Sequence, residues 1–215
     1  MTAARRTITL FGLAIAVILP AAGPVRFLPA VPGLNPLYLH ELFWWGLTIL
    51  VLLYVLLVER RALRTIGFRL PDWRSLAYGA LAAIVIGGGM FAIATFLLPA
   101  LHLKLNAQAL HSLLDTPLWF RVLLVTRAAV MEETLFRGYG IERLRELTGS
   151  SWVAGVVTLA LFTLAHLSTW GWAQLIIAGY GGLILTLLYF WRRDLVCNMI
   201  AHWITDAIGV LTAHG

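Results

Sequence analysis

The sequence predicts an all-α fold, a polytopic bundle of about seven (six to eight) transmembrane helices that forms a single membrane domain over residues 1–215. Two observations predict it. Of the 215 residues, 60% are hydrophobic and only 12% are charged, whereas soluble domains carry about 25% charged residues. The apolar residues also gather in long stretches, and about 20 apolar residues are needed for a helix to cross the hydrocarbon layer.

Seven stretches are long and apolar enough to be candidate spans. They are residues 8–22, 39–58, 75–98, 118–138, 152–168, 172–191 and 195–212. The first is short, and Pro24 directly after its small residues favours an uncleaved span over a signal peptide. Pro71-Asp72 is expected to start the third helix and Pro99 to end it, and Thr116-Pro117 to open the fourth. The amphipathic segment 141–147 is expected to continue the fourth helix.

The arginines predict the orientation. With the amino terminus inside, the inner segments hold eleven arginines and the outer ones only Arg26, Lys104 and Arg121. This bias predicts a multi-pass protein of a bacterial-type cytoplasmic membrane, with its amino terminus cytoplasmic and its carboxyl terminus outside. Because the arginines lie in short segments between apolar stretches, the net charge of +6 does not indicate nucleic acid. The lipid bilayer is the expected surrounding.

Ionisable residues inside the fourth span are the main functional signal. Charged side chains at membrane depth are costly and are functional candidates by default. Glu133 and Arg137 are four residues apart, share a helix face and are expected to pair. Glu132 points about 100° away, so the pairing leaves its carboxylate free for chemistry or for a partner helix.

Two later spans add imidazoles. His166 lies one turn after Phe162, and Asn198, His202 and Asp206 form a polar stripe at four-residue spacing. Such a stripe faces protein or water, not lipid, and Asp206 is a plausible carboxylate to orient His202. By these boundaries Glu132 lies near mid-span and His166 near a span end. Joint action therefore requires tilted helices or a different span end.

This set allows two kinds of chemistry. Glu132 and the histidines could activate water by general base catalysis, or Glu132, His166 and His202 could hold a divalent metal such as zinc. His40-Glu41 lacks the second histidine of a zinc-binding helix and reads as the interfacial start of a span. A Gly-x-Ser-x-Gly turn is absent, and the single cysteine, Cys197, excludes a disulfide.

Three motifs in order resemble the CAAX protease and bacteriocin-processing (CPBP, or abortive-infection) family of intramembrane metalloproteases. The family pattern is Glu-Glu-x-x-x-Arg, Phe-x-x-x-His and His-x-x-x-Asn. This chain has Glu132-Glu133-Thr-Leu-Phe-Arg137, Phe162-Thr-Leu-Ala-His166 and His202-Trp-Ile-Thr-Asp206. The resemblance covers residues 118–212, the expected catalytic core, and it departs from the pattern at Asp206.

The resemblance implies a CAAX-type endopeptidase that cleaves a membrane-associated peptide or protein with activated water. It implies catalytic roles for Glu132, Glu133, His166, His202 and Asp206. Glu132 would be the base, assisted by His166, and His202 and Asp206 would stabilise the oxyanion. The candidate substrate-binding residues are Arg137, Phe162 and Asn198. An ionised aspartate accepts hydrogen bonds only, so Asp206 donates one only when protonated.

Two rival functions use the same polar cavity. One is a non-catalytic membrane protein, such as an immunity or scaffold protein. The other is a proton-coupled transporter, which the absence of an internal repeat disfavours. The complete set of three motifs favours the endopeptidase. The sequence leaves the substrate, its prenylation, the metal and the oligomeric state open.

Overall fold

The computed structural model describes residues 2–29 and 31–212, and within these residues it is all-helical, with no strand. The helices run on from one another as α- and π-helical segments. The first three long helices are α1 (Ala3–Leu13), η1 (Ala14–Ile18) and α2 (Leu19–Ala21); α3 (Pro36–Leu53) and η3 (Tyr54–Val58); and α4 (Trp73–Ala92), η5 (Ile93–Leu97) and α5 (Leu98–Ala100). Short 3-10 turns, η2 (Pro24–Phe27) and η4 (Leu63–Ile66), lie in the loops.

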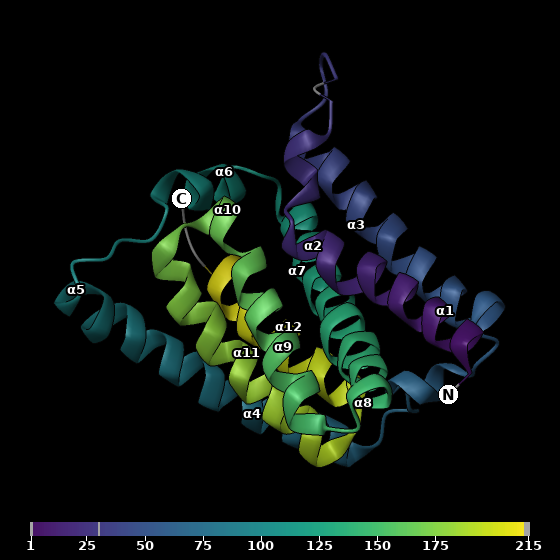
Figure 1. Ribbon diagram of the computed structural model, residues 1–215. Helices are drawn as coiled ribbons and strands as arrows, with labels where there is room; N and C mark the ends of the chain where they lie inside the picture. Colours follow the sequence, from purple (N-terminus) through teal and green to yellow (C-terminus); the bar gives the residue numbers. More distant parts are fainter. Residues whose placement is uncertain (1, 30, 213–215) are drawn as a thin grey trace.

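The second half of the chain carries the remaining helices. They are α6 (Ala107–Leu114); α7 (Leu118–Glu132), η6 (Glu133–Ile141) and α8 (Glu142–Thr148); α9 (Ser151–Ala165) and α10 (Leu167–Trp170); α11 (Trp172–Arg192); and α12 (Leu195–Leu211). The α7–η6–α8 helix runs through the middle of the bundle, with α1 and α3 on one side and α9, α11 and α12 on the other (Figure 1). Helix α12 packs against α4 and α7, and α9 packs against α11 and η6.

The span prediction is confirmed in outline. Five helices, Ala3–Ala21, Pro36–Val58, Trp73–Ala100, Ser151–Trp170 and Trp172–Arg192, are long and apolar enough to cross a membrane. The other two predicted spans are present as helices, but α12 is shorter and α7–η6 carries five ionisable residues. Large exposed side chains such as Phe91 and Phe96 cover the outer faces, as expected of a surface that faces lipid.

Several local details differ from the sequence expectation. Pro99 lies inside the last turn of its helix because that helix continues to Ala100. Thr116 does not cap the fourth helix: its hydroxyl donates to the Leu113 carbonyl, and Pro117 is the cap residue. Asp72 does cap α4, in a reciprocal box with Ser75. The segment 141–147 continues the fourth helix as expected, and α6 was not expected.

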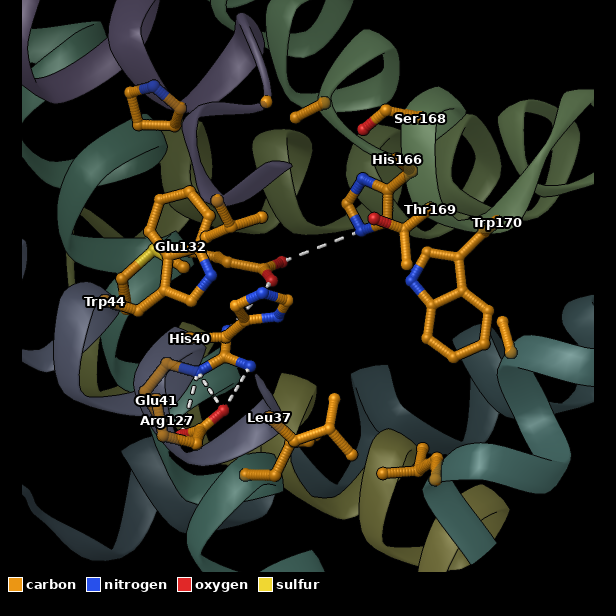
Figure 2. Close-up of a pocket in the computed structure, with 18 of the residues that line it drawn as sticks. Leu37, His40, Glu41, Trp44, Arg127, Glu132, His166, Ser168, Thr169 and Trp170 are labelled. Carbon is orange, nitrogen blue, oxygen red and sulfur yellow. Dashed lines mark hydrogen bonds and ion pairs between the residues drawn. The ribbon is translucent and has the colours of Figure 1, made fainter. Parts of the chain in front are cut away.

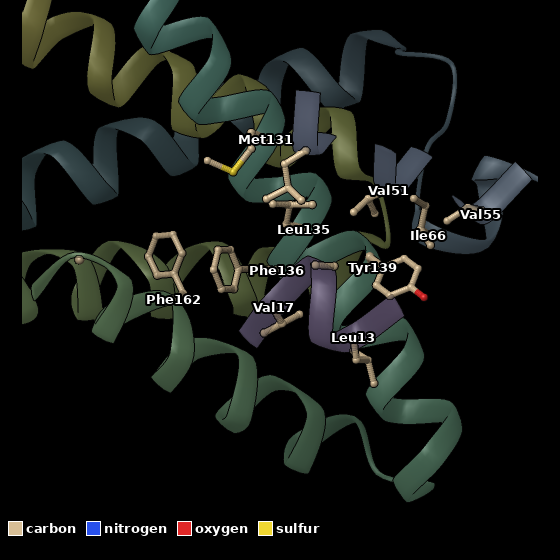
Figure 3. Close-up of a cluster of buried hydrophobic side chains, with 13 residues drawn as sticks. Leu13, Val17, Val51, Val55, Ile66, Met131, Leu135, Phe136, Tyr139 and Phe162 are labelled. Carbon is tan, nitrogen blue, oxygen red and sulfur yellow. The ribbon is translucent and has the colours of Figure 1, made fainter. Parts of the chain in front are cut away.

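The largest hydrophobic cluster surrounds η6. Leu13 and Val17 from the first helix, Val51 and Val55 from the second, and Phe162 from α9 all pack around it (Figure 3). Every residue of η6 is buried. A π-helical turn within an α-helix is rare and often marks a functional site, and this one begins at Glu133. The core therefore holds the motif-bearing helix on all sides.

Candidate active site

Glu132 and Glu133 are neighbours in the chain with opposite environments. The side chain of Glu133 is completely buried, whereas that of Glu132 keeps 14% of its surface exposed. Glu132 lines two adjoining cavities of about 260 and 310 Å³, and Glu133 lines neither. The first cavity, with Glu132 and its surroundings, is shown in Figure 2. The sequence predicts different roles for these two carboxylates, and in the structure only Glu132 has access to the cavities.

Glu133 is fully occupied by hydrogen bonds. Its Oε1 accepts from Arg137 Nη1 at 2.9 Å, and its Oε2 accepts from Asn198 Nδ2 at 3.1 Å. His202 Nδ1 also lies 2.9 Å from Oε1. Because a carboxylate is an acceptor, this contact makes Nδ1 the donor. The expected pairing of Glu133 with Arg137 is present, and Glu133 additionally joins η6 to α12.

Arg137 and Asn198 are likewise enclosed. Arg137 donates to the Gly182 carbonyl at 3.1 Å, and its guanidinium lies 4.1 Å from the centre of the Phe162 ring. Asn198 donates to the Leu185 carbonyl at 2.7 Å. Both side chains are buried, and neither lines a cavity. Of the three residues suggested for substrate binding, only Phe162 lines one.

Glu132 sits in a looser cluster. Its Oε2 lies 4.0 Å from His166 Nε2 and 3.8 Å from His202 Nε2, and its Oε1 lies 3.9 Å from Arg127 Nη1. Oε2 is a buried atom with no hydrogen-bond partner among the described residues. An unsatisfied buried carboxylate oxygen costs free energy, which sets this oxygen apart from the saturated Glu133.

The two imidazoles are held by different groups. His166 lies at the end of α9, and its Nδ1 is 2.9 Å from the Phe162 carbonyl oxygen. Since a carbonyl can only accept, Nδ1 carries a proton, and Nε2 is the ring nitrogen directed towards Glu132. His202 Nε2 lies 3.4 Å from Asp206 Oδ2. The ring is thus held by two carboxylates, Glu133 at Nδ1 and, as the polar stripe predicted, Asp206 beside Nε2.

Glu132 and His166 can lie at the same depth because the helices that carry them are offset along their axes. Glu132 is the last residue of α7, and His166 follows the last residue of α9, yet their side chains approach to 4.0 Å. The two helices therefore do not begin and end at the same level. The predicted end of the fifth span, residue 168, lies two residues before the end of the helix Ser151–Trp170, so a misplaced span end does not account for the approach of Glu132 to His166.

An ion pair missed by the sequence reasoning borders the site. Arg127 donates through Nε and Nη2 to Glu41 on α3, at 2.9 to 3.2 Å, and both side chains are buried. Glu41 was interpreted as interfacial, which is wrong. The two residues are 86 positions apart, so no periodicity could pair them. The signal available was an arginine within a span that needed a buried acid.

The cavities are mostly apolar. His40, Trp44 and Trp170 line the first, together with Glu132 and Arg127 (Figure 2). The second extends between α4, α11 and α12 and includes His202 and Asp206. The rings of Trp44 and Trp170 both face the site (Figure 2). An apolar pocket with a few convergent polar groups is typical of a ligand site.

The donor atoms of Glu132, His166 and His202 are of types that zinc binds, but their spacing does not fit. Two ligands of one tetrahedral zinc ion lie about 3.3 Å apart, less than the 3.8 and 4.0 Å from Glu132 Oε2 to the imidazoles. Within residues 2–29 and 31–212, no group of three His, Cys, Asp or Glu side chains forms a metal site. The metal hypothesis stays a prediction.

The chain is thus an all-helical membrane protein with a polar site inside the bundle, in which the carboxylate of Glu132 and the imidazoles of His166 and His202 border the cavities. Residues 114–208 match the family model described as "Type II CAAX prenyl endopeptidase Rce1-like". Residues 114–208 thus form an Rce1-like domain of the CPBP family. No curated protein and no solved structure matches the chain. The matched region agrees with the expected core of 118–212.

Proposed function

We propose that the chain is an intramembrane endopeptidase that hydrolyses a peptide bond by attack of water activated by Glu132. The observation that carries the proposal is the Oε2 atom of Glu132, which is buried and unpartnered, yet borders two cavities. The saturated neighbour, Glu133, provides the contrast. A carboxylate that the fold leaves without a hydrogen bond is available to accept a proton from water.

Water activation uses Glu132 and His166. Groups about 4 Å apart can share one water, which matches the 4.0 Å between Oε2 and His166 Nε2. Glu132 takes one proton from this water while the Nε2 lone pair accepts a hydrogen bond from the other. The hydroxide attacks the carbonyl carbon, and Glu132 then gives its proton to the leaving amine as the C–N bond breaks. The products are a carboxylic acid and an amine, and the acid then passes its proton to the amine or to solvent.

In this proposal His202 stabilises the oxyanion that forms when hydroxide attacks the carbonyl carbon. Its Nδ1 donates to Glu133, and its Nε2 lies near both Glu132 and Asp206. Since both ring nitrogens face carboxylate oxygens, the ring is arranged as a doubly protonated imidazolium, which is a strong donor to a developing oxyanion. Asp206 either supports this charge as a carboxylate or donates directly when protonated. Arg137 and Asn198 act by positioning Glu133.

The substrate is proposed to be a membrane-associated peptide or protein. Glu132 stands where the two cavities adjoin, and residues such as Leu113, Leu124 and Trp170 line both of them. An extended chain crossing this point would present one peptide bond to Glu132 and place its flanking groups in the apolar cavities. Prenylation of that substrate is part of the proposal, because a long hydrocarbon group suits apolar walls.

The test compares membrane peptide products from cells or proteoliposomes with wild-type protein and with Glu132→Gln. The substitution keeps the shape and removes the base, so cleavage should fall by about 10²–10⁴-fold, without loss of folded protein. His166→Ala should act similarly. Glu146→Gln is the matched control, since Glu146 borders neither cavity, and it should cleave normally. Full activity of Glu132→Gln would exclude the catalytic assignment. Identical product patterns without any cleavage would favour a non-catalytic binding protein.

A divalent metal is tested separately by chelation. The mechanism above has no step through a metal, so a chelator should leave cleavage unchanged. Loss of cleavage that is restored by zinc would instead show that Glu132, His166 and His202 close around an ion.

The orientation is proposed from the arginine distribution: amino terminus in the cytoplasm, in a cytoplasmic membrane. A cytoplasm-dependent reporter after Gly215 should be inactive. One inserted after Leu70, which is 95% exposed, should be active. An active reporter after Gly215 would mean that the spans were miscounted.

A further inference from the structure

A cationic cleft lies away from the two cavities. Its volume is about 460 Å³, and its walls come from the η4 loop, α8 and the end of α11. Five arginines line it: Arg61, Arg64, Arg69, Arg145 and Arg193. Glu142 and Glu146 are the acidic side chains in its lining, so the lining carries three net positive charges. None of these residues belongs to the proposed active site.

The two acids do not neutralise the whole cleft, because their oxygens are already committed. Glu146 binds Arg61 at 2.8 Å and Arg143 at 3.3 Å. Glu142 binds Arg145 at 2.8 Å and also Arg193, and it accepts a hydrogen bond from Tyr189 at 3.0 Å. An acid shared between two arginines leaves part of the positive charge free.

Arg64 and Arg69 are the cations that remain. Both are exposed, and the described residues make no hydrogen bond or ion pair with the guanidinium group of either. Their loop is nevertheless fixed. Ile66 is fully buried, Leu195 N–H donates to the Gly67 carbonyl at 2.9 Å, and a Cβ on Gly67 would lie 2.6 Å from the Tyr189 hydroxyl. Gly67 adopts φ +86°, which favours glycine. Two free guanidinium groups are thus held on a rigid backbone.

The cleft lies at the level where lipid headgroups are expected. It sits at the end of the bundle that carries α8 and the amino terminus (Figure 1). Three helices have exposed tryptophans at this end: Trp73 at the start of α4, Trp152 at the start of α9 and Trp191 near the end of α11. Exposed tryptophans at helix ends mark the membrane–water interface. A ligand in the cleft would therefore meet both the arginines and the bilayer.

We propose that this cleft binds the phosphate of an anionic phospholipid headgroup. The planar guanidinium groups of Arg64 and Arg69 match a phosphate diester, each with two parallel donors, and basic pockets between membrane helices are suited to such headgroups. Arginines that only set the topology need no common cleft. The exposed Arg6 and Arg74 line no such cleft and provide the comparison.

The test measures lipid affinity of the full-length protein in neutral detergent, by native mass spectrometry and by the rise in thermal unfolding temperature. The probes are phosphatidylglycerol, phosphatidylcholine and inorganic phosphate. Wild-type protein should prefer phosphatidylglycerol. Because an arginine near a membrane surface is worth about fivefold in affinity, Arg64→Gln/Arg69→Gln should weaken that binding about 20- to 30-fold. Arg6→Gln/Arg74→Gln, which removes the same charge elsewhere, should keep wild-type affinity.

Three results would overturn the proposal. Equal binding of phosphatidylglycerol and phosphatidylcholine would show no anion site, and an equal effect of inorganic phosphate would show a free-anion site and not a lipid site. Equal losses in the two double variants would indicate only general charge attraction. Unfolding temperatures without lipid confirm folding, and Arg69→Gln alone replaces the double variant if that variant does not fold. Cleavage activity is not a readout, so the result is independent of the proposed function.

Discussion

The molecule holds two clusters of glutamate and arginine that differ in how completely they are bonded. In the first, at the arginine-rich end, Glu59 accepts from Arg143 at 2.6 to 3.1 Å and from the Tyr139 hydroxyl at 2.7 Å. In the second, Glu132 faces two imidazoles and Arg127 at 3.8 to 4.0 Å, without a hydrogen bond to Oε2. The residue types are alike. Saturation of hydrogen bonds, and not charge, distinguishes the cluster around Glu59 from the cluster around Glu132 for which we propose reactivity.

The largest effect is expected where the saturated cluster is broken. Arg143→Met would leave Glu59 buried and unpaired, which costs about 3–5 kcal/mol of stability. Thermal unfolding in detergent and the monodisperse fraction should both fall, while activity per folded molecule stays unchanged. Arg145→Met is the control: its side chain is 44% exposed, so the change should cost at most about 1 kcal/mol. Equal stability of the two variants would contradict the comparison.

A smaller effect is expected inside the loose cluster, at Asp206. This side chain is 33% exposed and lies 3.4 Å from His202 Nε2. Asp206→Asn restores the residue of the family pattern and keeps a donor, so cleavage should stay within about tenfold of wild type. Asp206→Ala should lose on the order of 10²-fold, as when an oxyanion donor is removed.

Equal inactivation by both Asp206 substitutions, with folded protein retained, would show that a carboxylate is required there. The site would then be read as a charged His–Asp pair or a metal site. Folding of each variant is checked by size-exclusion chromatography before its activity is compared.

The smallest effect is the pH dependence of the stability that Glu146 contributes at the arginine-rich end. Burial alone would raise the pKa of Glu146, but the hydrogen bond from Arg61 and the charges of Arg143 and Arg61 outweigh burial and lower this pKa. A lowered folded-state pKa contributes stability above the ordinary carboxyl pKa, and this stability is lost as pH falls through the lowered value. The pair is partly exposed, so at most about 1 kcal/mol is expected.

The measurement compares unfolding temperatures of wild type and Glu146→Gln across the acidic range. Their difference should shrink as the pH falls below the ordinary carboxyl range. A difference that stays constant would mean that Glu146 titrates equally in both states.

The sequence predicted what local spacing can encode. The apolar stretches located the helices, and a four-residue interval paired Glu133 with Arg137. Local spacing could not predict long-range partners. Glu41 meets Arg127, and Glu133 meets His202, only after the helices pack. The expected neighbour Asp206 lies 3.4 Å from His202 Nε2, but the closer carboxylate, Glu133 at 2.9 Å from Nδ1, is on another helix and could not be inferred from spacing.

The second limit of the sequence prediction was its assumption of regular α-helical geometry. The sequence reasoning treated the fourth span as an α-helix of constant turn, but residues 133–141 are π-helical. Packing stabilises this segment, since all of its residues are buried, and packing is not visible in a sequence pattern. The short helix α6, which borders both cavities through Leu113, was missed because its apolar run is too brief to read as a span.

The charges of the α7–η6 helix have a consequence for biogenesis. Arg127, Glu132, Glu133 and Arg137 lie within one helix, and this helix is not among the five that are apolar enough to cross a membrane. Each such residue costs about 2.5–3.5 kcal/mol during insertion by the translocon. The groups that offset this cost include Asn198 and His202, which the ribosome makes more than 60 residues later. The α7–η6 helix is therefore expected to enter the bilayer stably only together with helices synthesised after it.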